Sequence, residues 1–526
     1  MPASPRSIDA TALKTALHDG GEIALLDARE EVPFDARHVL MAACVPFSRL
    51  ELLIDASVPR RGTRVVWCDD GEGLADLAAA RMIALGWNDV SVLAGGIAAW
   101  KAAGHPLYEG VHVPSKAFAE VVEHEVGTPW ITAEDLKRMI DDKADIVLFD
   151  SRSYAEFHEN SIPTAISVPG AELVYRFDDL VKSRDTLVVV NCGGRTRSII
   201  GAQALINAGV PNRVVSLRNG TQDWHLAGYE VLRGRTERMQ AVSPAGHETA
   251  RARAATMAER FGVLRIDAAT LAAWRAEADA RTLYVFDVRD PEEYEARHIA
   301  GMKHVAGGQL VQETDRHAAT WGARIVCVDD DGVRAVVTAH WLIQMGWEAA
   351  ALTLDSSAMI GATGPWQPTV LGLDEPVPGL AVDELRRLLE RDEAVVIDLD
   401  WSRSYRSGHI PGAWYGIRSR LGTILPTLPA GRTIVVTSSD GTLARLAARE
   451  HPVLALQGGT RAWAAAGLSM ETGATRMATP PDDMRLRARE QAGGVEAAMR
   501  AYLAWEINLA AQMATDSDHR FQIRRA

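Results

Sequence analysis

The residues from Val188 to Ser198 bring together the groups that activate a cysteine. An apolar run ends at Asn191 and Cys192, two glycines and two arginines follow, and a helical pattern begins at Ser198. Amide groups at a helix N-terminus and neighbouring cations lower the pKa of a reactive cysteine to roughly 3.5–7.5. The same amides can hold an anion carried on the sulfur. We therefore predict that Cys192 is a nucleophilic thiolate.

The loop after Cys192 supplies several candidate hydrogen-bond donors. Gly193 and Gly194 let the backbone curl so that amide groups face the sulfur. We expect the donors to be the amides from Gly194 to Ser198, together with the hydroxyl groups of Thr196 and Ser198. Such a loop would stabilise a thiolate and, equally, a persulfide anion.

Three arginines and one aspartate accompany this loop. We expect Arg197 to turn inward and hold the loop or the oxygens of an anionic substrate through charge-assisted bonds. We expect Arg195 to point to solvent and attract that anion. Asp150 and Arg152 lie at the end of a neighbouring predicted strand, where they either brace the loop or form an ordinary strand-end ion pair.

Length and composition restrict the class of protein. A chain of 526 residues is too long for one core and suggests about three or four domains. A net charge of −13 argues against nucleic acid or an anionic membrane as the main partner. Four cysteines without metal-ligand spacing indicate neither a disulfide framework nor a zinc site. The chain shows no signal peptide and no membrane-spanning run, so we expect a cytoplasmic protein.

Four segments of the chain share one order of motifs. Each has a helix-start signal, a buried strand ending in aspartate, a second buried strand, and a helix rich in alanine and leucine. Three segments continue the first aspartate as Asp-x-Arg, and three close with Gly-Gly or Asn-Gly before a tryptophan. Strands that alternate with helices predict an α/β fold in which each repeat is a parallel sheet flanked by helices.

We place four domains and a tail along the chain. The last segment differs from the repeats, because Met499, Tyr502, Leu503 and Leu509 follow helical spacing on one face. This tail helix either packs on a neighbouring domain or forms a contact in a homodimer. The predicted ranges are 1–123, 124–249, 250–375 and 376–478 for the domains, and 479–526 for the helical tail.

The motifs together resemble those of the rhodanese, or thiosulfate sulfurtransferase, family. The resemblance covers nearly the whole chain as four tandem rhodanese-like domains. It rests on Asp-x-Arg, the His-Ile-Pro-Gly type of turn, the cysteine loop and the Gly-Gly-x-x-x-Trp ending. It implies that Cys192 takes a sulfane sulfur from a small anionic donor such as thiosulfate, as a persulfide, and passes it to a thiol or cyanide acceptor. This ping-pong reaction needs no metal or organic cofactor.

Only one repeat carries the complete loop. The third and fourth repeats have no sulfur nucleophile, and we expect Asp69, Asp70 and Glu72 to raise the pKa of Cys68 in the first. We therefore predict one catalytic domain, the second. The four corresponding stretches are Cys68-Asp-Asp-Gly-Glu-Gly73, Cys192-Gly-Gly-Arg-Thr-Arg197, Asp329-Asp-Asp-Gly-Val-Arg334 and Ser438-Ser-Asp-Gly-Thr-Leu443.

Two other functions are open from the sequence. A cysteine-based phosphatase needs five residues between cysteine and arginine, whereas four separate Cys192 from Arg197, which favours a sulfur atom over phosphate. The protein could also be a slow or non-catalytic sulfur-relay scaffold that carries persulfide to a partner protein. The physiological donor is also open, with thiosulfate, 3-mercaptopyruvate and glutathione persulfide as candidates.

Overall fold

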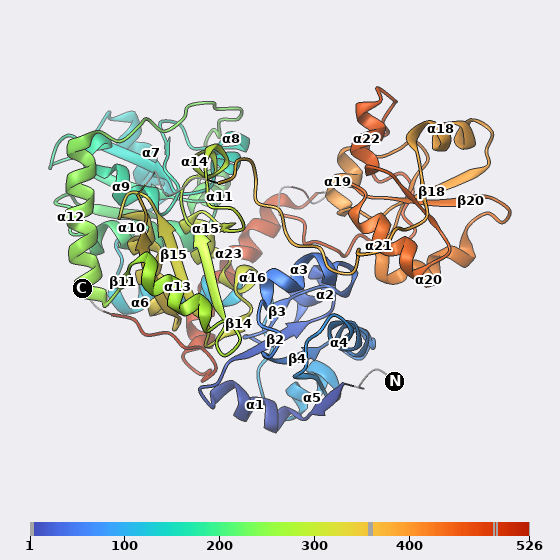
Figure 1. Ribbon diagram of the computed structural model, residues 1–526. Coiled ribbons are helices and arrows are strands. Elements are labelled where there is room, and N and C mark those ends of the chain that lie inside the picture. Colours follow the sequence, from blue (N-terminus) through green and yellow to red (C-terminus); the bar gives the residue numbers. More distant parts are fainter. Residues whose placement is uncertain (1–4, 356–360, 488–489, 491–492, 525–526) are drawn as a thin grey trace.

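The computed structural model describes residues 5–355, 361–487, 490 and 493–524 (Figure 1). Each repeat forms its own mainly parallel sheet covered by helices on both faces, as predicted. The strand order is the same in all four repeats. Across each sheet the strands lie in the order first, fifth, fourth, second and third. In the second repeat this order is β6-β10-β9-β7-β8.

The first two repeats occupy the N-terminal half of the chain, and the long helix α6 connects them. Their elements are β1 (Arg6–Ile8), α1 (Ala10–His18), β2 (Ile23–Asp27), α2 (Glu31–Ala36), β3 (Ala43–Cys44), η1 (Phe47–Arg49), α3 (Leu50–Ser57), β4 (Arg64–Cys68), α4 (Leu74–Ala84), β5 (Val90–Leu93), α5 (Gly96–Ala102), α6 (Val113–Val126), β6 (Trp130–Ile131), α7 (Ala133–Asp141), β7 (Ile146–Asp150), α8 (Tyr154–Glu159), β8 (Ile166–Ser167), α9 (Glu172–Leu180), β9 (Leu187–Asn191), α10 (Thr196–Asn207), β10 (Val214–Leu217) and α11 (Gly220–Leu226).

A second connecting helix, α12, leads to the third and fourth repeats, and a C-terminal helix follows them. These elements are α12 (Pro244–Phe261), β11 (Leu264–Ile266), α13 (Ala268–Ala276), β12 (Leu283–Asp287), α14 (Pro291–Ala296), β13 (Lys303–His304), α15 (Gly307–Gln312), α16 (Thr314–His317), β14 (Thr320–Trp321), β15 (Arg324–Asp329), α17 (Arg334–Gln344), β16 (Glu348–Thr353), β17 (Gly379–Leu380), α18 (Val382–Glu390), β18 (Ala394–Asp398), α19 (Ser402–Ser407), β19 (Trp414–Tyr415), η2 (Arg418–Arg420), α20 (Leu421–Ile424), η3 (Leu425–Thr427), β20 (Thr433–Thr437), α21 (Thr442–Glu450), β21 (Leu454–Leu456), α22 (Gly459–Ala465) and α23 (Val495–Met513).

Capping residues start the first helix of three repeats. The side chains of Asp9, Thr132 and Asp267 accept hydrogen bonds from backbone amides in the first turns of α1, α7 and α13. Each of these bonds satisfies one of the amides that an isolated helix end leaves unpaired. The fourth repeat has Ala381 at this position and no side-chain cap. The helix-start signals in the sequence thus have the local structure expected of them.

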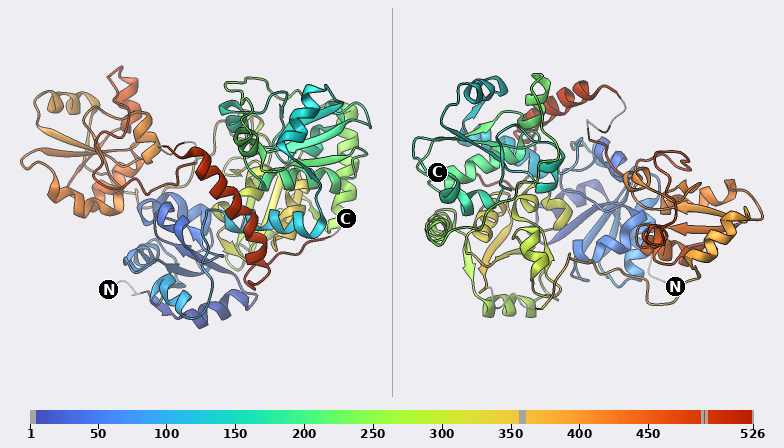
Figure 2. Two further views of the ribbon diagram at one scale, coloured as in Figure 1. Left: turned by 180° about the vertical axis from the view of Figure 1, so that it is seen from behind. Right: turned by 90° about the horizontal axis from the view of Figure 1, so that it is seen from above.

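The first three repeats share one continuous hydrophobic core, whereas the fourth has cores of its own. Helix α12 packs against α9 and α17, and α6 packs against α10 and α23. The third repeat also contributes β14, which pairs antiparallel with β2 of the first. Figure 2 shows the fourth repeat to one side of the first, with α23 returning from it toward the second repeat. The predicted tail helix therefore packs on neighbouring domains.

A buried arginine joins the second and third repeats. Arg334 is completely buried, and it stands in the third repeat where Arg197 stands in the second. Its guanidinium lies 2.8 Å from Glu172 of the second repeat and 2.6 Å from Asp331 of its own loop.

In the part of the chain that the structure describes, no helix is long and apolar enough to cross a membrane.

Arg334→Leu should destabilise the unit formed by the second and third repeats by about 3–5 kcal/mol, because it leaves the buried Asp331 without its ion-pair partner and leaves Glu172 with Arg176 alone. Urea unfolding followed by tryptophan fluorescence measures this. The matched change Arg386→Leu removes a half-exposed partner of Glu390 and should alter stability by less than about 0.5 kcal/mol. Equal unfolding midpoints for the two variants would contradict the role of Arg334.

Candidate active site

The cysteine loop lies at the carboxyl end of the central strand of the second sheet. Strand β9 ends at Asn191, Cys192 follows with 2% of its surface exposed, and α10 begins at Thr196. The carbonyl oxygen of Cys192 accepts hydrogen bonds from the amide and hydroxyl of Thr221, at 2.8 and 3.0 Å. The amide of Gln222 donates to the Gly193 carbonyl at 3.1 Å. Helix α11 thus holds the loop carbonyls on the side away from the sulfur.

The closing motif of the repeat makes this contact possible. Gly220 has φ +56°, and a Cβ atom there would lie 2.3 Å from the carbonyl oxygen of Cys192. Gly96 and Gly459 approach the corresponding carbonyls of Asp69 and Ser438 in the same way. The glycine at the second position of the Gly-Gly or Asn-Gly pair before the tryptophan is therefore required, because only a residue without a Cβ lets the helix dock on the loop backbone.

Only some of the groups expected to donate hydrogen bonds to the sulfur do so. The Gly194 amide bonds the sulfur. The Ser198 hydroxyl does not donate to the sulfur, contrary to expectation: it accepts from the Cys192 thiol at 3.6 Å and donates to the Arg195 carbonyl at 2.7 Å. Among the residues described, the amides of Arg195, Thr196 and Arg197 have no backbone acceptor. The Ser198 amide instead donates to the Arg195 carbonyl at 3.1 Å, so it is not one of the donors to sulfur.

The expected low pKa of Cys192 is wrong for the free protein. Burial raises the pKa of this thiol, and the nearby carboxylate of Glu506 raises it further. The positive charge of Arg197, the Ser198 hydroxyl and the Gly194 amide all act in the opposite direction but do not overcome burial. The sequence showed the stabilising groups but not the depth of the site, so the resting group is a neutral thiol.

Arg195 does not point to solvent, which corrects the second expectation. Its side chain is 4% exposed, and its guanidinium donates to both carboxylate oxygens of Glu120, at 2.6 and 2.8 Å. It also bonds Glu123 and the side chain of Asn219. Helix α6 supplies both carboxylates, and nothing near Cys192 in the sequence indicated that this helix would lie beside the loop. Arg195 fixes the loop to α6 rather than attracting an anion.

Arg197 and Thr196 also have partners that the sequence did not show. The Arg197 guanidinium lies beside the loop, but it bonds both carboxylate oxygens of Glu156, at 2.7 and 2.8 Å, and the side-chain oxygen of Gln309 at 2.8 Å. The hydroxyl of Thr196 donates to Glu506 of α23 at 2.6 Å and not to the sulfur, contrary to expectation.

Asp150 and Arg152 form a buried bidentate ion pair, with bonds of 2.9 and 2.6 Å. The first and third repeats contain the same pair, so it is a structural element of the repeat. In the second repeat Arg152 also borders a cavity in front of the loop and would contact a Cβ atom at Gly193 at 3.8 Å. The ordinary strand-end ion pair is therefore observed, whereas bracing of the loop by this pair stays a prediction.

Cys68 does not occupy the position of Cys192, contrary to the prediction. It is the last residue of β4, as Asn191 is of β9, and Asp69 stands where Cys192 stands in the second repeat.

The environment of Cys68 is also unsuitable for a nucleophile. Burial is the main cause that raises its pKa well above the ordinary value, followed by the charge of Asp27. The expected repulsion from the loop carboxylates is smaller, and Asp69 has another role. Its carboxylate accepts the amides of Gly71 and Ala75, both at 3.0 Å. The loop amides that could stabilise a sulfur anion are thus already occupied.

The other two repeats also satisfy their loop amides with their own carboxylates. Asp329, in the cysteine position of the third repeat, accepts the amide of Ala335 at 2.9 Å. In the fourth repeat Asp440 accepts the amide of Thr442 at 2.9 Å. The loop from Cys192 contains no acidic residue, so no carboxylate of the loop competes with an anion on the sulfur for its amides.

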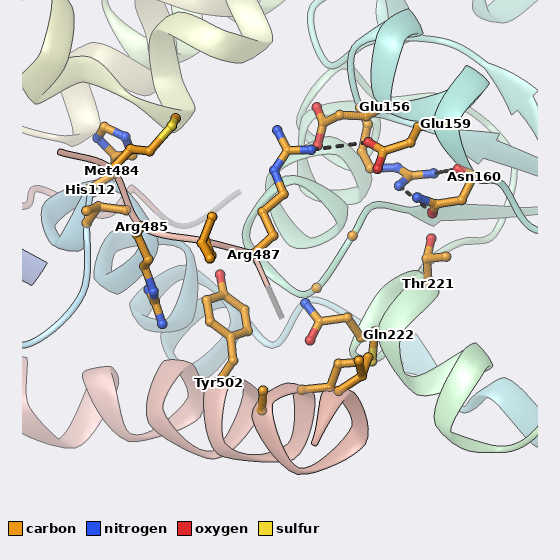
Figure 3. A pocket seen from close by; sticks show the side chains of 18 of the residues that line it. His112, Glu156, Glu159, Asn160, Thr221, Gln222, Met484, Arg485, Arg487 and Tyr502 are labelled. Carbon is orange, nitrogen blue, oxygen red and sulfur yellow. Dashed lines mark hydrogen bonds and ion pairs between the residues drawn. The ribbon is translucent and has the colours of Figure 1, made fainter. Parts of the chain in front are cut away.

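A cavity of about 1190 Å³ opens in front of this loop (Figure 3). Every repeat and the tail contribute to its wall. Residues that the sequence did not single out border it, among them Lys116 of α6 and Gln222 of α11. Glu506 lies beside the cavity on the otherwise apolar buried face of α23, three residues from both Leu503 and Leu509. A charged residue at that spacing in the sequence is the signal that could have identified Glu506 as part of the site. Lining residues include His112, Lys116, Arg152, Arg197, Gln222, Arg316, Arg403, Arg485 and Tyr502.

The model of the rhodanese-like domain family matches four times, at residues 9–103, 132–227, 267–357 and 381–466. The chain belongs to the rhodanese family. A crystal structure of thiosulfate sulfurtransferase from Pseudomonas aeruginosa is similar to it, with 45% identity, a TM-score of 0.95, and coverage of 98% of this chain and 99% of that one. A sulfurtransferase from Allochromatium vinosum is 31% identical over 102 residues, which are 19% of this chain and 92% of that protein.

Gly220→Ala should distort this rhodanese loop, because the new methyl group would meet the Cys192 carbonyl, and a shift of about 1 Å at a reactive group costs on the order of 100-fold in rate. Steady-state sulfur transfer and thermal unfolding measure the effect. Gly228→Ala is the matched control, since Gly228 also has a positive φ but no atom within 4 Å of its added Cβ. Equal activities of the two variants would show that the close approach is unimportant.

The rate of Cys192 alkylation by iodoacetamide should still rise with pH above pH 9, because the thiol pKa lies above its ordinary value and only the thiolate reacts. Glu506→Gln removes a negative charge, lowers this pKa, and should speed alkylation at pH 8 roughly threefold or more. The exposed Glu134→Gln should change nothing. A rate that is level between pH 7 and pH 9 would contradict the raised pKa.

Proposed function

We propose that the protein transfers a sulfane sulfur from thiosulfate or a similar anionic donor to a thiol or cyanide acceptor through a persulfide on Cys192. One observation carries the proposal. Of the four corresponding loops, this is the one with a cysteine whose neighbouring amides are not occupied by a carboxylate of the same loop. The similarity to a thiosulfate sulfurtransferase along almost the entire chain supports the same function.

In the first half-reaction the Cys192 thiol first loses its proton to water, and the resulting thiolate attacks the outer sulfur of thiosulfate. A new bond joins the two sulfur atoms, the sulfur–sulfur bond of the donor breaks, and sulfite leaves with the electron pair. In the second half-reaction the acceptor attacks the terminal sulfur of the persulfide. The bond to Cys192 then breaks, and Cys192 recovers the electron pair as a thiolate.

The loop assists both steps electrostatically. The Gly194 amide, the Ser198 hydroxyl and the charge of Arg197 favour an anion at the sulfur. These groups are fixed before the reaction: Arg197 by Glu156, and the loop carbonyls by α11. Fixed dipoles and charges in a buried site stabilise a developing anion without the cost of reorienting solvent.

Cys192→Ser should abolish thiosulfate:cyanide sulfur transfer, because a serine hydroxyl cannot form the persulfide. Cys68→Ser is the matched control and should retain activity, since Cys68 is fully buried at the end of β4, next to a loop whose amides Asp69 accepts. Thiocyanate production by the purified variants measures both. Wild-type turnover in Cys192→Ser, or rapid hydrolysis of p-nitrophenyl phosphate by the wild-type protein, would contradict the proposed function.

A further inference from the structure

The cavity in front of Cys192 is much larger than a small inorganic anion requires. Its volume is about 1190 Å³, whereas pockets of roughly 300–1,000 Å³ enclose drug-sized organic ligands. It extends from Gly193, Gly194 and Arg197 at the sulfur loop to His112 and Lys116 at the start of α6. Thiosulfate or cyanide at the sulfur would leave the Lys116 end unused.

Lys116 is a buried cation without a hydrogen-bonding partner. Its side chain borders the cavity and the residue is 5% exposed. Within the described ranges its ammonium group makes neither a hydrogen bond nor an ion pair, and lies 5.4 and 5.0 Å from the ring centres of Tyr502 and Trp505. A buried ammonium normally has a carboxylate partner, because removing it from water is costly.

A positive charge at the position of Lys116 lowers the stability of the fold. It follows Val113, Pro114 and Ser115 in the first turn of α6, where the helix dipole disfavours a positive charge. Burial lowers the pKa of its ammonium group to about 8, and the charge of Arg485 acts in the same direction. The carboxylates of Glu506, Asp35 and Asp315 oppose that shift without contacting the group.

One aromatic ring connects this cation to the sulfur loop. Tyr502 rises from α23 into the cavity (Figure 3), and its ring centre lies 5.4 Å from the Lys116 ammonium group. Its Cε1 atom would lie 3.3 Å from a Cβ atom at Gly194. Next to it Gln222 presents a side-chain oxygen that is buried and has no hydrogen-bond partner. A ligand that reached from the loop to Lys116 would pass an apolar ring and an amide.

We propose that Lys116 forms a subsite for the carboxylate of an organic thiol that accepts sulfur from Cys192. The proposal rests on the proposed function and names the class of acceptor: a carboxylate-bearing thiol of peptide size, such as glutathione. The thiolate of this acceptor attacks the terminal sulfur of the persulfide. The new sulfur–sulfur bond makes the acceptor a persulfide, and Cys192 leaves as a thiolate with the electron pair.

Transfer from preloaded protein tests the subsite. Full-length protein is loaded with thiosulfate, freed of donor, and mixed with glutathione, glutathione diethyl ester or cyanide, and loss of the persulfide is followed by mass spectrometry. We expect wild-type protein to react at least tenfold faster with glutathione than with the ester, since a charge-assisted hydrogen bond contributes about one to two orders of magnitude.

Lys116→Met should remove this preference and lower the ratio of the glutathione rate to the cyanide rate at least tenfold. Lys116→Arg should restore most of the ratio, and Lys182→Met, at a lysine with 73% of its side chain exposed, should not alter it. Comparing rates within one preloaded sample cancels any effect on donor binding. An unchanged preference in Lys116→Met would overturn the subsite.

A binding measurement separates this proposal from the proposed function. Calorimetry with S-methylglutathione, which cannot accept sulfur, should show binding to wild-type protein at least tenfold tighter than binding of its diethyl ester. This measurement needs neither a persulfide nor a variant that folds. Equal affinities would reject the subsite even if Cys192 transfers sulfur, whereas failure to load Cys192 would reject the sulfur transfer and leave the binding result to decide the subsite.

Discussion

The docking of helix α11 on the backbone of the cysteine loop is the contact on which the site depends. The amides of Thr221 and Gln222 donate hydrogen bonds to the carbonyl oxygens of Cys192 and Gly193. Only a glycine at position 220 lets the two backbones come so close. With its carbonyls held on one side, the loop presents amides on the other, toward the sulfur. The nucleophile, the charged residues around it and the cavity wall are all placed relative to this fixed loop.

The four repeats carry four versions of this loop, and only the second has the cysteine at its start. Each keeps the strand order, and three keep the glycine that approaches the loop carbonyl. In the repeats other than the second, a carboxylate of the loop itself occupies the amides. Arg334 of the third repeat has become a buried link to Glu172 of the second. The other repeats therefore contribute to the active unit as walls and supports.

The repeated motifs were enough to predict the parallel sheets, the helix caps, the family and the single complete loop. They report local backbone geometry, which depends on residues close together in the chain. The partners of Arg195, Arg197 and Thr196 come instead from α6, α8, α15 and α23, up to 310 positions away. Side-chain direction and burial around Cys192 follow from how the repeats pack, so the raised thiol pKa could not be predicted from the loop.

A persulfide on Cys192 would be seen in the intact mass of the protein after brief exposure to thiosulfate and removal of the excess. We expect one added sulfur atom per chain, located on the peptide that contains Cys192 and lost when cyanide is added. No adduct, or an adduct on Cys44, Cys68 or Cys327 instead, would contradict this expectation.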